Sequence, residues 1–94
     1  MTNGEHLGGL DRRWNVRHHD ALATWLRSEP TLGSIGSVLE WIRSCELLGP
    51  PAEALLVDDG DTCRLSVPGT SVEIEFLVVT YELLILVRSI TGGT

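Results

Sequence analysis

The sequence predicts an α+β domain in which two helices pack on one face of a small antiparallel sheet. Apolar residues recur every three to four positions before Pro50 and every second position after it, which indicates helices followed by strands. Proline and glycine interrupt the chain on both sides of the second helical pattern, at Pro30 and at Gly49 to Pro51. The length of 94 residues allows a single domain, which we place at residues 11–94.

The first half of the chain contains a short strand and two helices. Residues 1–10 include three glycines and show no period, so they are expected to form a flexible arm. Residues 12–17 alternate apolar and polar side chains, as a strand does. Residues 18–29 carry an apolar stripe at helical spacing, and Pro30 ends this helix. Residues 31–48 form a longer helix whose inner face consists of Ile35, Val38, Leu39, Ile42 and Cys45.

The second half is predicted to form four short strands. They cover residues 54–57, 62–67, 71–78 and 83–90, with turns at residues 58–61, 68–70 and 80–82. Connections this short require antiparallel pairing, because a parallel return needs a crossover of about a dozen residues or more. The expected order of elements is therefore β-α-α-β-β-β-β, with both helices on one side of the sheet.

The alternation assigns side chains to the two faces of the sheet. The face toward the helices is expected to hold Cys63, Leu65, Val67, Val72, Ile74, Phe76, Leu83, Ile85 and Val87. The opposite face is expected to hold Arg64, Ser66, Glu73, Glu75, Leu84, Leu86 and Arg88. Leucines among opposite charges indicate a partner-binding surface, and the alternative is an ordinary exposed face with two leucines. Trp41 lies beside the inner stripe of the second helix, so it either flanks the core or extends this surface if its ring is exposed.

The charge distribution argues against nucleic acid as a direct ligand. The formal net charge is −6 with a pI near 4.8, and all seven basic residues are arginine. Residues 1–30 are neutral in sum, so the whole excess of acid lies in residues 31–94. A protein that neutralises phosphates needs the opposite sign. No apolar run approaches the roughly 20 residues of a membrane helix, and no secretion signal opens the chain, so a cytoplasmic location is expected.

Motifs for metal, cofactor or nucleotide chemistry are missing from the sequence. Cys45 and Cys63 show no metal-ligand spacing and are interpreted as small buried side chains rather than as a disulfide or a zinc site. No glycine-rich phosphate loop is present. His18 and His19 open a helix and are interpreted as solvated. Glu73 and Glu75 share a strand face, where an ion pair with Arg64 or Arg88 is favoured over a catalytic carboxylate pair.

The segment from Trp14 to Thr94 resembles the RelE/ParE toxin superfamily, most closely its HigB-type members. Trp14-Asn15-Val16 followed by Ala23-Thr24-Trp25-Leu26 is similar to the first strand and helix of that family. Leu47-Leu48-Gly49-Pro50 resembles its helix exit, Cys63-Arg64-Leu65 its following strand, and Leu84-Ile85-Leu86-Val87 its penultimate strand. The resemblance implies a RelE-like fold. It also implies a ribosome-dependent mRNA endonuclease that an antitoxin segment binds on the sheet face or edge.

The residues that active members of this family use are not retained. The arginine expected in the fourth strand falls on Glu73, and a common tyrosine falls on Phe76. The basic or aromatic residues expected near the end of the chain fall on Arg88, Ile90, Gly92 and Gly93. A carboxylate about 4 Å from a phosphate costs on the order of 4 kcal/mol at an effective dielectric constant near 20. The resemblance therefore predicts the fold better than it predicts nuclease activity.

Three functions remain open from the sequence. The favoured one is a protein-binding module without nuclease activity, whose partner is an antitoxin or a host protein, and whose small size is compatible with a homodimer. Its binding residues would be Arg64, Glu73, Glu75, Leu84, Leu86, Arg88 and Trp41. The second is a divergent mRNA interferase that uses Arg64 and Arg88 with Tyr81 or His18. The third is an acidic inhibitor, encoded by a phage or mobile element, that mimics nucleic acid through residues 58–61, Glu73 and Glu75.

Overall fold

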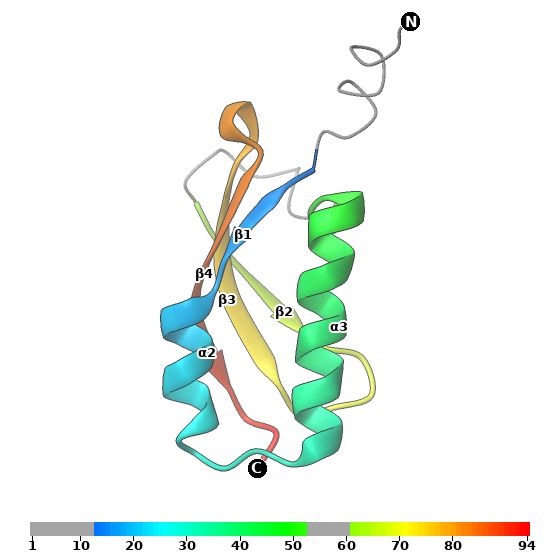
Figure 1. Ribbon diagram of the computed structural model, residues 1–94, viewed down its shortest axis with the longest axis vertical. Coiled ribbons are helices and arrows are strands. Elements are labelled where there is room, and N and C mark those ends of the chain that lie inside the picture. Colours follow the sequence, from blue (N-terminus) through cyan, green and yellow to red (C-terminus); the bar gives the residue numbers. More distant parts are fainter. Residues whose placement is uncertain (1–12, 53–60) are drawn as a thin grey trace, which may run out of the picture.

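The computed structural model describes residues 13–52 and 61–94 and shows an α+β fold (Figure 1). The predicted arm at residues 1–10 and the predicted strand at residues 54–57 lie outside the described residues. The elements follow the order β1 (Asn15–Arg17), α2 (His19–Leu26), α3 (Leu32–Leu48), β2 (Thr62–Ser66), β3 (Glu73–Val79), the 3-10 helix η2 (Thr80–Glu82) and β4 (Leu84–Thr91). The strands form one sheet in the order β1-β4-β3-β2.

The sheet is mixed, so the expectation of a purely antiparallel sheet is wrong for one pair. β3 pairs antiparallel with both β2 and β4, as the short turns between them require. β1 instead runs parallel to β4, with Val16 opposite Ile85. Two helices and two strands separate β1 from β4 in the chain, and a connection of this length permits a parallel return. A tight turn fixes the antiparallel direction only of the two strands that it joins.

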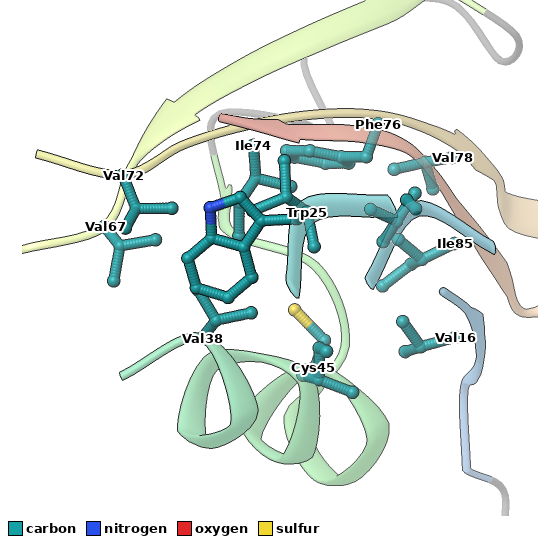
Figure 2. Packing of buried hydrophobic residues seen from close by; sticks show 14 residues of the cluster. Val16, Trp25, Val38, Cys45, Val67, Val72, Ile74, Phe76, Val78 and Ile85 are labelled. Atoms are coloured by element: carbon teal, nitrogen blue, oxygen red, sulfur yellow. The ribbon is translucent and has the colours of Figure 1, made fainter. Parts of the chain in front are cut away.

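Both helices cover the same face of the sheet and close one hydrophobic core. Figure 2 shows Trp25 of α2 in the middle of this cluster, with Val38 and Cys45 of α3 on one side and Ile74 and Phe76 of β3 on the other. Trp25 is 3% exposed, and its indole Nε1 donates a hydrogen bond to the carbonyl oxygen of Gly92 at 2.8 Å. A buried tryptophan needs such a partner for its one donor.

Local sequence signals account for the helix boundaries. Thr31 caps α3, because its hydroxyl oxygen accepts a hydrogen bond from the backbone N–H of Ser34 at 3.2 Å. The helix ends at Gly49, whose φ of 86° lies in the left-handed region. Its missing side chain also makes room for the indole of Trp14, which an added Cβ would meet at 2.9 Å. α2 ends at Leu26, earlier than expected, because the following turn brings Glu29 to a φ of 57° ahead of Pro30.

The end of β4 is anchored to the connection between α2 and α3. The backbone N–H of Thr31 donates to the carbonyl oxygen of Gly93 at 2.8 Å, and the N–H of Gly93 donates to Ser71 Oγ at 3.1 Å. Gly92 has a φ of 86°, and a Cβ there would collide with the carbonyl oxygen of Ser71. Close packing therefore requires glycine at both positions 92 and 93.

We expect Gly92→Ala to destabilise the fold by about 2–3 kcal/mol, since it adds both a left-handed strain and a collision with backbone. Gly69→Ala is the matched control. Gly69 has a similar φ of 77°, but nothing lies within 4 Å of its added Cβ, so only the strain of about 1 kcal/mol remains. Urea unfolding of both variants measures the difference. Equal destabilisation would mean that the end of β4 is not packed against Ser71.

Candidate functional site

The sheet has a second face, directed away from α2 and α3, which we call the outer face. Its residues alternate along each strand with those of the core, and the register of the three strand pairs aligns them. They are Asn15 and Arg17 of β1, Leu84, Leu86, Arg88, Ser89 and Thr91 of β4, Glu73, Glu75, Leu77 and Val79 of β3, and Thr62, Arg64 and Ser66 of β2. Six of the seven residues that the sequence assigned to a binding surface lie here.

An apolar strip crosses the two central strands of the outer face. Leu77 lies opposite Leu86 and Val79 lies opposite Leu84, and such directly opposed side chains are about 5 Å apart. Leu84 is 8% exposed although it does not belong to the core cluster, while the other three are half-buried. The alternation of the sequence predicted Leu84 and Leu86 on this face, whereas Leu77 and Val79 were not predicted there. The signal was available, because both continue the alternation that begins at Glu73.

An ion pair lies on the outer face at the other end of β3. Arg64 Nε and Glu75 Oε2 are 3.0 Å apart, and the two residues are direct neighbours in the β2–β3 register. The side chain of Arg64 is 73% exposed and that of Glu75 is 31% exposed, so water screens the pair and its contribution stays below about 1 kcal/mol. The predicted ion pair of Arg64 is confirmed with Glu75. The carboxylate balances the guanidinium that a phosphate would otherwise contact.

A β-bulge positions Arg88 on the outer face. The register shifts between Glu75, which lies opposite Ser89, and Phe76, which lies opposite Val87, so Arg88 is the extra residue of β4. Arg88 is exposed, as is Arg17 on β1 beside Leu86. Among the described residues, the outer face thus carries three arginines and two glutamates. Its local charge has the opposite sign to the chain's net charge of −6.

Tyr81 and His18 lie at different places relative to the two arginines. Tyr81 is 81% exposed in η2, six positions after Glu75, which corresponds to roughly 15–20 Å along the strand. His18 lies between β1 and α2, where its Nδ1 is 2.9 Å from the carbonyl oxygen of Val16. It lines an open pocket of about 520 Å³ together with Arg17, His19, Asp20, Glu46 and Leu86, among others. Tyr81 is therefore not gathered with the arginines, whereas the pocket of His18 is also lined by Leu86 and Val87, the two residues before Arg88.

Trp41 lies on the other side of the sheet from the remaining predicted binding residues. Its half-buried ring packs on Phe76, with the ring centroids 5.4 Å apart and the planes tilted by 60°. Phe76 belongs to the core, so Trp41 flanks the core on the helical side and does not extend the outer face. Of the two alternatives that the helical period left open, the structure selects this one.

Both cysteines are free thiols. Cys45 is 2% exposed, as expected for a small core side chain, whereas Cys63 on the edge strand β2 is half-buried. Burial, followed by the charge of Glu46, raises the pKa of Cys45 from 9.0 to about 11. Desolvation and then Asp61 also raise the pKa of Cys63. In residues 13–52 and 61–94, no three His, Cys, Asp or Glu side chains are grouped so that they could hold a metal ion.

Comparison with family models, curated proteins and solved structures finds no significant match for this chain. Within the described part of the chain, no helix has the length and apolar character needed to cross a membrane.

Because the folded state raises the pKa of Cys45, it holds the thiol proton more tightly than the unfolded chain does. This contribution to stability is complete below pH 9.0 and is lost as the pH rises toward about 11. Urea unfolding between about pH 8 and pH 11 should show a loss on the order of 2–3 kcal/mol. Cys45→Ala should reduce this loss of stability with rising pH, whereas Cys63→Ala should keep the part of the loss that is due to Cys45. An unchanged loss in Cys45→Ala would mean that ionisation of Cys45 is not its cause.

Proposed function

We propose that this chain is a protein-binding module whose partner docks on the outer face of the sheet. The observation that carries the proposal is the apolar strip of Leu77, Val79, Leu84 and Leu86 on the face that the helices do not cover. Half-buried leucines at the centre of a surface, surrounded by charged groups, have the anatomy of an interface in which apolar anchors supply affinity.

The apolar and charged side chains on the outer face indicate which side chains a matching partner presents. Burial of the half-exposed leucines contributes about 25 cal/mol for each Å² that leaves water. Arg17 and Arg88 lie beside the strip and are exposed, so a partner that presents carboxylates next to apolar side chains matches both features. The charges contribute register and association rate more than affinity. An amphipathic acidic segment of an antitoxin or of a host protein has this chemistry.

The same geometry favours binding over RNA cleavage. Glu75 pairs with Arg64, and Glu73 lies two positions away on the same face, so two carboxylates stand where an RNA backbone would approach Arg64. A positioned acid or base must lie within hydrogen-bond reach of the reacting group, and Tyr81 is far along the strand from Arg64. The imitation of nucleic acid is not favoured either, since the arginines outnumber the glutamates on the outer face. Residues 58–60 of the acidic segment lie outside the described residues.

Substitutions on the outer face should weaken capture of the partner that a pull-down from the source cells identifies. Leu86→Asp places a charge in the apolar strip, and we expect at least about a tenfold loss of affinity. Leu48→Asp is the matched control, because Leu48 is 82% exposed on α3. Leu84 is unsuitable for this test, since its burial means that Leu84→Asp would also destabilise the fold.

A second variant avoids the apolar strip altogether. Arg17→Glu combined with Arg88→Glu changes only exposed side chains, so circular dichroism and thermal melting should match those of the wild-type chain. Its capture of an acidic partner should fall and should become less dependent on salt. If capture is unchanged in both this variant and a folded Leu86→Asp, the partner does not bind the outer face.

A direct assay separates the binding module from the nuclease. We expect the purified chain to leave mRNA intact on translating ribosomes, because Arg64 is paired with a carboxylate and Tyr81 lies far along the strand from it. Cleavage that is abolished by Arg64→Ala together with Arg88→Ala would establish the nuclease and contradict the proposal. Cleavage that survives this double substitution would indicate a contaminating enzyme.

A further inference from the structure

The side of α3 that faces away from the sheet carries three of the six large hydrophobic side chains that are exposed in the described chain. Leu32 is 87% exposed, Leu39 47% and Leu47 50%, and none of them belongs to the core cluster, so the predicted inward position of Leu39 is wrong. These leucines recur with Gly36, Glu40 and Arg43 at spacings of three and four residues, so all six lie on one face of the helix. We call this set the α3 stripe. α3 forms one flank of the molecule in Figure 1.

No contact within the described chain requires glycine at the two glycine positions of α3. Gly33 and Gly36 lie inside the helix, where glycine is less favourable than alanine because it loses more conformational freedom on folding. Their added Cβ atoms would meet nothing within 4 Å, so the described chain does not require either glycine. The surface over Gly36 is instead a shallow hollow of about 680 Å³, lined by Arg13, Leu39, Glu40, Arg43 and Leu47, among others. A hollow of this kind fits a side chain from outside.

The α3 stripe is complementary to itself when a second copy lies antiparallel to it. A two-fold axis midway between Glu40 and Arg43 places each Glu40 opposite Arg43 of the second copy. The same axis places Leu47 of the second copy over the hollow at Gly36, because the two positions are equally far from it. Neither Glu40 nor Arg43 forms an ion pair within the described chain, so both charges are available. In such an isologous contact every interaction occurs twice.

From this complementarity we infer that the α3 stripe is a homodimer interface, with the two α3 helices antiparallel and related by a two-fold axis. α3 has 17 residues and is therefore about 25 Å long. A contact limited to one helix from each copy lies at the low end of interface sizes, so the dimer is weak and depends on concentration. The outer face of the sheet points away from this interface and stays accessible in both copies.

Reversal of single charges in the 94-residue chain tests the antiparallel register of the two α3 helices. Sedimentation velocity over a micromolar to millimolar concentration series should show the wild-type mass rising from 10.3 kDa toward twice that value. Glu40→Arg and Arg43→Glu should each weaken dimerisation by about tenfold or more, because each places like charges opposite one another. An equimolar mixture of the E40R and R43E chains should regain the dimer, since the mixed pair restores two opposite-charge contacts.

Three further variants keep the test independent of folding and of the outer face. Gly36→Leu fills the hollow without an internal clash, so we expect a weaker dimer together with a higher thermal midpoint. Leu86→Asp and Leu48→Asp lie off the stripe and should leave dimerisation unchanged, while Glu40→Arg should leave capture of the outer-face partner unchanged.

Three outcomes would overturn the inference. The first is a wild-type chain that stays monomeric throughout the concentration series. The second is a dimer that Glu40→Arg and Gly36→Leu do not affect, and the third is a mixture of E40R and R43E chains that does not recover. Loss of the dimer only in Leu86→Asp would move the interface between copies to the outer face.

Discussion

The two central strands of the sheet carry apolar side chains on both faces, while the two helices cover only one. β3 contributes Ile74, Phe76 and Val78 to the core and Leu77 and Val79 to the opposite side, and β4 divides its side chains in the same way. The core therefore depends on close packing of α2 and α3 against the sheet face that they cover. The outer face keeps an apolar strip that the helices do not cover, and the proposed binding of a partner depends on that asymmetry.

Hydrogen bonds at one end of the molecule hold the helices against the sheet face that they cover. Trp25 and Thr31 both donate hydrogen bonds to the glycines that follow β4, so the turn between the helices is joined to the end of a central strand. At the other end, the N–H of Trp14 donates to the carbonyl oxygen of Glu46 at 3.2 Å, and the Trp14 indole packs on Gly49. Contacts at both ends thus connect the helix pair to the sheet, and the sides that remain for partners are the outer face and the far side of α3.

The hydrophobic period and the turn-forming residues predicted the fold class and most of the residues on the sheet face that the helices cover. Eight of the nine residues expected to face the helices are buried or half-buried within or against the core, and the exception is Leu83. Leu83 lies between η2 and β4 with a φ of 51°, in a left-handed turn that alternation does not reveal. The parallel pairing of β1 with β4 was not predictable from local pattern, since it joins residues about 70 positions apart. The bulge at Arg88 and the packed glycines at positions 92 and 93 likewise depend on long-range contacts.

Hydroxyl-radical footprinting of the side chains shows whether a protein partner docks on the outer face. The chain is oxidised alone and in complex with its captured partner, and the modification of each side chain is compared. The account predicts that Leu77 and Leu86 lose reactivity in the complex, while Leu48 and Tyr81, both more than four-fifths exposed in the free chain, keep theirs. Unchanged reactivity at Leu77 and Leu86, with protection at Leu48 or Tyr81, would contradict docking on the outer face.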